Sequence, residues 1–201
     1  MASTVATDLA TGMPQDVLVL ARPGDRIGFS TGLTVDADAR VHRDFTPAEV
    51  QDGIATLPVP PSASITYRVE RAGARVAGST NAWSVVQLDG LAQLATAAPL
   101  RPSTGTATEA AVDNAVGPVL TALGRSAAEL HPVLLWHGEV PLTSGGSSSV
   151  VTVALTLPSG AVVLGTGMDG ESGGYCGASV VPAGSPLPDV CLLYTSPSPR
   201  D

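Results

Sequence analysis

Short runs of alternating hydrophobic and polar residues fill the first 87 positions of the chain. In Ser64–Val69, the apolar residues Ile65, Tyr67 and Val69 alternate with polar ones, which is the two-residue period of a half-buried strand. Further short runs, bounded by Gly, Pro or polar residues, are Asp16–Leu20, Arg26–Ser30, Ala39–His42, Ile54–Val59, Arg75–Ala77 and Trp83–Leu88. A spacing of about ten residues predicts a β-rich region over 1–87, arranged as a small sandwich or curled sheet.

A helical period replaces this alternation in residues 88–130, which we interpret as a helical connector. Apolar residues first repeat at helical spacing in Leu88–Ala98, and Pro99–Gly105 then interrupts the pattern. The strongest helical stretch is Thr106–Leu130, whose apolar face consists of Val112, Val116, Val119, Leu120 and Leu123.

Local signals mark the start, middle and end of the stretch 106–130. Thr106 and Glu109 fit a capping box, in which a hydroxyl and a carboxylate each bond a free backbone N–H at the helix start. Gly117-Pro118 predicts a kink or a split, because proline lacks an N–H and clashes with the preceding turn. Gly124 is expected to end the helix, with Ser126–Leu130 as a further turn.

Strand patterns return in residues 131–190. Pro132–Val140 and Val150–Leu157 are predicted strands, separated by a Gly/Ser loop over Thr143–Ser149. Pro158-Ser159-Gly160 predicts a tight turn into a partner strand, Ala161–Thr166, and Ala178–Pro182 is a predicted last strand. The whole pattern predicts an α+β fold with a β-rich N-terminal part, central helices and a C-terminal antiparallel hairpin sheet.

Composition and charge exclude several classes of protein. The chain is 44% hydrophobic and only 14% charged, which excludes a disordered polymer. Ten Arg and no Lys stand against eighteen Asp and Glu, for a net charge of −8, and no basic stripe suited to nucleic acid is visible. Abundant Ala, Gly, Pro and Arg indicate a G+C-rich genome, so the missing Lys is first a codon effect.

Neither a membrane span nor a signal peptide is predicted within the chain. No run of 18 apolar residues occurs. Met1–Leu20 lacks a basic start and an unbroken apolar stretch. Two interpretations stay open: a cytoplasmic protein, or one whose anchor lies upstream of Met1.

The last eleven residues, CLLYTSPSPRD, are identical to the translation of a transposase sequencing adapter read from its second base. The unused first base, C, would complete a GTC codon for Val190. Segments of technical origin are set aside in fold reasoning. We therefore expect the native chain to comprise 1–190, cut short at its C-terminal end, with 191–201 not native. A disulfide from Cys176 to Cys191 then has no basis, and an oxidising compartment is not implied.

Few residues suggest chemistry, and each has a plainer structural interpretation. Asp169 and Glu171 lie in the glycine-rich stretch Gly165–Gly177, which lacks the following helix of a phosphate cradle and the ligand spacing of an EF-hand. A mobile hairpin or Ω-type loop is favoured there over a cation or ligand site. His137 and Glu139 share one face of a predicted strand, but two residues fall short of the ligand set of a zinc site.

An acidic cluster and a cysteine also have structural interpretations beside the chemical ones. Asp36, Asp38 and Asp44 surround Arg40 and Arg43, which favours surface salt bridges over a metal site. Cys176 is interpreted as a free cysteine, a half-cystine with a partner beyond the truncation, or a catalytic thiol.

No catalytic, metal or cofactor-binding residue is assigned from the sequence. No G-x-S-x-G elbow occurs, and no pattern implies a cofactor. The candidates for a ligand site are His137, Glu139, Asp169, Glu171 and Cys176.

The sequence favours a non-enzymatic binding or sensory module over an enzyme. We expect the extracytoplasmic part of a membrane-tethered or secreted bacterial protein, with a protein or envelope partner. One alternative is a fragment of a cytoplasmic enzyme with a site near His137, Asp169 and Glu171. The other is a structural accessory domain.

Overall fold

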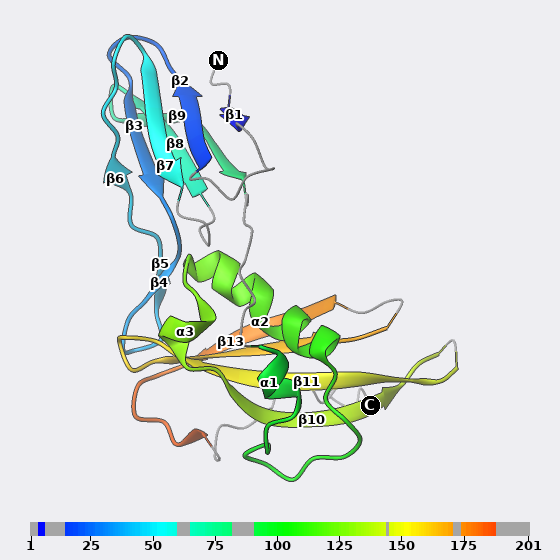
Figure 1. Cartoon of the computed structure of the whole chain (residues 1–201). Coiled ribbons are helices and arrows are strands. Elements are labelled where there is room, and N and C mark those ends of the chain that lie inside the picture. The colour runs from blue at the N-terminus through cyan, green and yellow to red at the C-terminus, as the bar shows by residue number, and fades with distance from the viewer. Residues whose placement is uncertain are drawn as a thin grey trace, which may run out of the picture.

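The chain folds into two lobes, an N-terminal β-sandwich and a C-terminal lobe in which helices cover one face of an antiparallel sheet (Figure 1). The computed structural model describes residues 4–6, 15–59, 65–81, 91–143, 145–170 and 174–187. The predicted α+β class is confirmed, with strands outnumbering helices. The predicted strand Trp83–Leu88, the start of the predicted helix Leu88–Ala98 and the whole of 191–201 lie outside the described residues.

The sandwich packs a three-stranded sheet against a four-stranded one, and every pairing within them is antiparallel. The first sheet contains β1 (Thr4–Ala6), β2 (Gln15–Leu20) and β7 (Ile54–Val59). The second contains β6 (Thr46–Pro47), β3 (Arg26–Ser30), β8 (Ile65–Arg71) and β9 (Ala74–Asn81). Side chains of both sheets share one core: Val17, Val19, Ile27, Ala55, Ile65, Tyr67 and Val69. The predicted buried face of Ile65, Tyr67 and Val69 is thus confirmed.

The C-terminal lobe is a four-stranded meander with helices on one side. Its strands follow chain order: β10 (Val133–Pro141), β11 (Ser147–Thr156), β12 (Val162–Met168) and β13 (Gly174–Val181). The helices are α1 (Ala92–Ala95), α2 (Glu109–Leu123) and α3 (Ala127–Leu130). α2 lies across β11, β12 and β13, and its apolar face joins the lobe's main core (Figure 1).

Two glycines of β12 let α2 approach the sheet at backbone distance. A Cβ on Gly165 would lie 2.1 Å from the carbonyl oxygen of Ala115, and one on Gly167 would lie 2.2 Å from the amide nitrogen of the same residue. Ala111 and Ala115 are the fully buried residues on the facing side of the helix. Small residues on both partners therefore set the spacing of helix and sheet.

Helix α2 differs from the sequence prediction at its start and in its middle. Its N-cap is Thr108, whose hydroxyl accepts a hydrogen bond from the Ala111 amide, so the expected Thr106 cap is wrong. The carbonyl of Thr106 is bonded instead by the Ser149 hydroxyl at 2.8 Å, which ties that residue to the sheet. The helix is not split at Gly117-Pro118: it continues through Pro118, which lies on the exposed face while the buried face stays packed. Gly124 ends it in the left-handed conformation, as expected.

Strands of the C-terminal lobe extend further than predicted. β11 begins at Ser147, inside the expected Gly/Ser loop, and β12 and β13 absorb most of the expected glycine-rich loop. Gly165 and Gly167 of that stretch serve the close packing of α2, and β12 and β13 pair as a hairpin whose turn includes residues outside the described ranges. The Pro158–Gly160 turn is confirmed, with Gly160 at φ +83°.

A hairpin inserted between β3 and β6 joins the two lobes. It contains β4 (Thr34–Val35) and β5 (Val41–His42), and Val35 is buried in the core of the C-terminal lobe. The Leu33 amide donates to the carbonyl of Ala122 at 2.7 Å, near the end of α2. Gly32 and Gly124 cross there so closely that a Cβ on either would lie 2.2 Å from the other segment's backbone oxygen. The N-terminal part of the chain thus contributes buried residues to the sandwich core and, through Val35, to the core of the C-terminal lobe.

Candidate functional site

The carboxylate of Asp169 accepts hydrogen bonds from three donors on neighbouring segments of the C-terminal lobe. Its Oδ2 accepts from the Thr108 hydroxyl at 2.7 Å. Its Oδ1 accepts from the Ser148 hydroxyl at 2.9 Å and from the Ser149 amide at 2.7 Å. The Asp169 amide in turn donates to the Ser149 carbonyl at 3.0 Å. One side chain therefore joins the end of β12, the start of β11 and the N-cap of α2, and we call this group the Asp169 clamp.

Hydrogen bonding keeps Asp169 ionised. The Thr108 hydroxyl makes the largest contribution to lowering the pKa of Asp169 below its ordinary value, with further contributions from Ser148 and Ser149, while burial acts in the opposite direction. A general acid needs a raised pKa, and a general base needs a free lone pair facing a substrate. Asp169 has the opposite of the raised pKa that a general acid needs, and its three bonds to donors of its own lobe support a role in holding that lobe together.

His137 and Glu139 lie on β10, where a flanking segment covers the strand's outer edge. The amides of Leu100 and Arg101 donate to carbonyls of β10, so residues 100–104 run beside the strand. The ring Nδ1 of His137 lies 3.2 Å from the Thr104 carbonyl oxygen, and the His137 amide donates to the Ser103 hydroxyl at 3.1 Å. The exposed Glu139 accepts from the Ser147 hydroxyl at 3.2 Å. Both side chains thus contact the backbone or hydroxyls of neighbouring segments.

The structure does not gather the sequence candidates into one site. Within the described ranges, no contact joins His137 to Asp169, and no group of three His, Cys, Asp or Glu side chains is placed to hold a metal ion. Glu171 lies outside the described residues. Of the residues proposed for a site near His137, Asp169 and Glu171, the structure gives Asp169 a structural role, as the centre of the Asp169 clamp.

Cys176 lies at a β-bulge of the edge strand β13. The pairing shifts there, because Gly177 faces Thr166 while Tyr175 faces Gly167. The thiol is free and exposed, with its Sγ 3.7 Å from the Gly174 carbonyl oxygen. Neither a helix N-terminus nor a cation contacts this thiol in the part of the chain that the structure describes, so nothing there activates it as a nucleophile.

The acidic cluster of Asp36, Asp38 and Asp44 belongs to the inserted hairpin. The Oδ1 of Asp36 accepts from the amides of Asp38 and Arg40, which shapes the turn between β4 and β5. Asp44 accepts from the Thr34 hydroxyl at 3.1 Å, and its Oδ2 lies 3.5 Å from Nε2 of His42. The carboxylates of Asp36 and Asp44 therefore stabilise a turn and a hairpin, and the described residues of this cluster form no metal-binding group.

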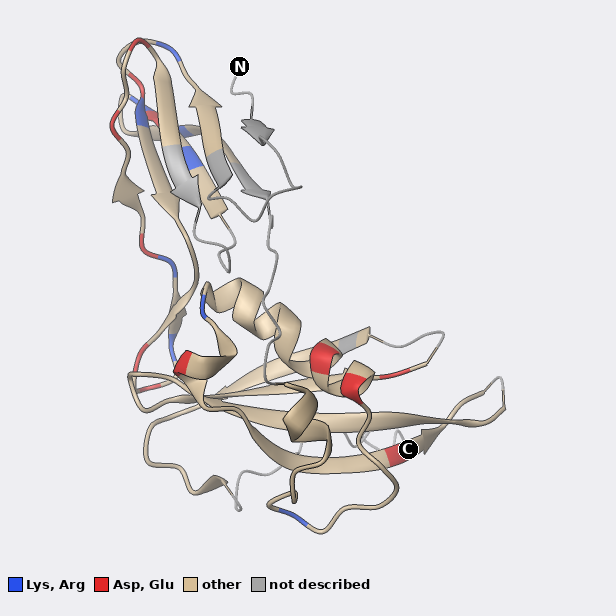
Figure 2. Cartoon of the chain, in the orientation of Figure 1, with Lys and Arg blue, Asp and Glu red and all other residues tan. Residues whose placement is uncertain are grey.

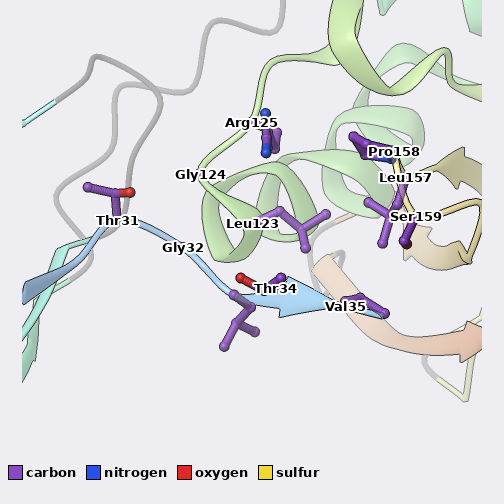
Figure 3. A pocket seen from close by; sticks show the side chains of 11 residues that line it. Thr31, Gly32, Thr34, Val35, Leu123, Gly124, Arg125, Leu157, Pro158 and Ser159 are labelled. Atoms are coloured by element: carbon purple, nitrogen blue, oxygen red, sulfur yellow. The ribbon is translucent and has the colours of Figure 1, made fainter. Parts of the chain in front are cut away.

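An open groove follows the junction of the two lobes (Figure 3). It encloses about 420 Å³ between residues 31–35, the end of α2 and the β11–β12 turn. The one cationic side chain in its lining, Arg125, is paired with Glu129 at 3.2 Å, so its charge is already neutralised. Thr34 and Ser159 supply hydroxyls and Leu157 an apolar wall, a mixture that selects no particular ligand chemistry.

Sequence reasoning missed the partners of the clamp. Thr108, Ser148 and Ser149 are ordinary Thr and Ser residues in polar stretches, and nothing in their spacing to Asp169 signals a contact. The capping-box template also selected Thr106, two positions too early. The antiparallel pairing of β11 with β12 brings Ser148 and Ser149 to the carboxylate, and the packing of α2 on the sheet brings Thr108.

Comparison with known proteins finds no matching family model, no matching curated protein and no matching solved structure. Among the described residues, no helix has both the length and the apolar character needed to cross a bilayer. We therefore infer the function from the chain's own residues.

Proposed function

We propose that this chain is a non-enzymatic binding module, the extracytoplasmic part of a membrane-tethered or secreted protein. The observation that carries the proposal is the Asp169 clamp. Asp169 is one of the sequence candidates for a ligand site, and both of its carboxylate oxygens accept hydrogen bonds from donors of its own lobe. A carboxylate whose oxygens are bonded within its own lobe helps to hold that lobe as a rigid scaffold.

The arrangement of the lobes also supports a binding role. The sandwich extends away from the helical lobe and is held to it by the buried hairpin residue Val35 and by close backbone contact at Gly32 and Gly124 (Figure 1). A joint of this kind presents the turns at the far end of the sandwich in a fixed orientation. Binding residues are commonly carried by loops on a rigid scaffold.

Sequencing the source DNA across both ends of this chain tests the proposal. We expect an in-frame signal or transmembrane segment upstream of the Met1 codon. We also expect the reading frame to continue past Val190 into codons other than those for CLLYTSPSPRD. An upstream stop codon, or an upstream catalytic domain without a membrane or export segment, would contradict the proposed location. Native DNA that encodes the same eleven residues would show that they belong to the protein.

A further inference from the structure

The end of the sandwich away from the helices, here called the distal tip, exposes three apolar side chains. Tight turns over 21–25, 51–53 and 72–73 form this end (Figure 1). Leu20, Ile54 and Val76 are 41%, 44% and 49% exposed. Leu20 and Ile54 are cross-strand partners, and Leu20 and Val76 line one small cavity of about 120 Å³, so the three form a continuous tip patch.

The distal tip is also locally basic in an acidic protein. Residues 20–26, 51–54 and 70–76 hold four of the ten Arg and only three of the eighteen carboxylates. Two of those carboxylates are neutralised, since Asp25 pairs with Arg71 through two bonds of 2.8 Å and Glu70 pairs with Arg68 at 3.0 Å.

Three guanidinium groups of the tip are left without an acidic partner. In the described parts of the chain, no ion pair within 4.0 Å joins a carboxylate to the guanidinium of Arg22, Arg26 or Arg75, and all three residues are exposed. Arg22 meets the Asp25 carboxylate through its backbone amide, at 3.1 Å. Asp52 is the one unpaired carboxylate of the tip ranges given above. Figure 2 shows basic and acidic residues intermixed toward this end of the sandwich, and acidic ones on the helix α2.

The first described strand places Thr4 beside the distal tip. β1 runs antiparallel to β2, and Thr4 pairs with Val19, the residue before Leu20 (Figure 1). A membrane anchor upstream of Met1, which is part of the proposed function, would therefore lead into the molecule at this end. The membrane would then face the tip patch and its Arg side chains.

We propose that the distal tip docks on an anionic lipid surface, an inference that rests on the proposed membrane tether. The tip patch enters the interfacial region, and Arg22, Arg26 and Arg75 contact the lipid phosphates. A standard protein interface buries roughly 800 Å² per partner on surfaces of matching shape, whereas a fluid bilayer needs no matching shape to take up three half-exposed side chains on short turns. The acidic helical lobe lies at the other end, beyond a screening length of about 8 Å at physiological salt.

Vesicle cosedimentation of the full chain tests this docking. We expect binding to mixed phosphatidylcholine and phosphatidylglycerol vesicles, little binding to pure phosphatidylcholine, and loss of binding as salt rises. Replacing Arg22→Gln together with Arg75→Gln should lower the partition coefficient about fivefold for each Arg removed. Arg40→Gln together with Arg125→Gln changes the net charge equally, away from the tip, and should leave binding near the wild-type level.

A matched pair of apolar variants completes the test. Leu20→Asp should lower the partition coefficient about tenfold by removing apolar burial. Leu100→Asp makes the same change at a residue that is 47% exposed in the other lobe, and it should have little effect. No binding to the mixed vesicles, or equal losses in the tip variants and their controls, would overturn the docking.

Three other outcomes are informative. Self-association in light scattering that Leu20→Asp abolishes would assign the tip patch to a second copy and overturn lipid docking. Vesicle binding with the expected variant pattern supports the docking even if the gene encodes no anchor. That combination would contradict only the proposed membrane tether. An anchor without any vesicle binding contradicts the docking and leaves the proposed function standing.

Discussion

Replacing Gly167 with alanine is expected to lower the free energy of unfolding by about 3 kcal/mol or more, because the added methyl group meets backbone. Its Cβ would lie 2.2 Å from the Ala115 amide nitrogen and 2.5 Å from the Ala111 carbonyl oxygen. A flexible side chain could move aside, but α2 is itself fixed by residues buried on its whole inner face. The helix must therefore shift away from β12 and lose contacts along its length. Stabilities of whole domains are only about 5–15 kcal/mol, so the loss is large.

Urea denaturation followed by circular dichroism measures this loss as a lower midpoint. Gly174→Ala is the matched control, since Gly174 lies in β13 of the same sheet and a Cβ there would meet nothing within 4 Å. We expect the control to unfold within about 0.5 kcal/mol of wild type. Equal midpoints for Gly167→Ala and Gly174→Ala would mean that α2 does not approach the sheet at backbone distance.

Replacing Asp169 with asparagine is expected to cost about 2 kcal/mol near neutral pH, the scale for a hydrogen-bonded charge. The amide keeps the shape of the carboxylate but removes its charge and one acceptor oxygen. The donors from Thr108, Ser148 and Ser149 then compete for a single oxygen. Because these hydrogen bonds hold the fold together, we expect the variant to lose stability even in the absence of any substrate.

The cost of Asp169→Asn should depend on pH in a definite direction. The folded state lowers the pKa of Asp169 below its ordinary value of 3.8. Stability from the ionised carboxylate is therefore present above the unfolded-state pKa and is lost as pH falls through the lower, folded-state pKa. Asp25 also has a lowered pKa, caused mainly by its bonds to Arg71, so wild type and variant share that second loss. The difference between the two urea midpoints isolates Asp169 and should shrink in acid, whereas a gap that is constant or grows in acid would contradict the clamp.

Local patterns in the sequence predicted most strands and the fold class because they act over a few residues. Ile65, Tyr67 and Val69 alternate, and the sandwich core buries them as expected. The turn at Gly160 and the helix end at Gly124 follow from the backbone freedom of glycine, and both are confirmed. These features need no knowledge of distant parts of the chain.

Features that depend on long-range packing were not predicted. Gly165 and Gly167 suggested a loop, because the sequence does not show that a helix of small residues lies against them. Pro118 suggested a break, but burial of one helix face outweighs one missing hydrogen bond. The Asp169 clamp joins residues 61 positions apart, at Thr108, and 21 apart, at Ser148. Only the completed sheet brings these groups together.

The most direct test of the central claim, that Asp169 is a structural clamp and not an acid–base catalyst, is its own titration. Carboxyl-carbon NMR of the labelled protein follows the pKa of Asp169 residue by residue. We predict a pKa below the ordinary 3.8, and a shift toward that value in Thr108→Val, which removes the largest contribution to the lowering. A pKa above 3.8 in the wild-type protein, insensitive to Thr108→Val, would contradict the clamp and restore Asp169 as a candidate general acid.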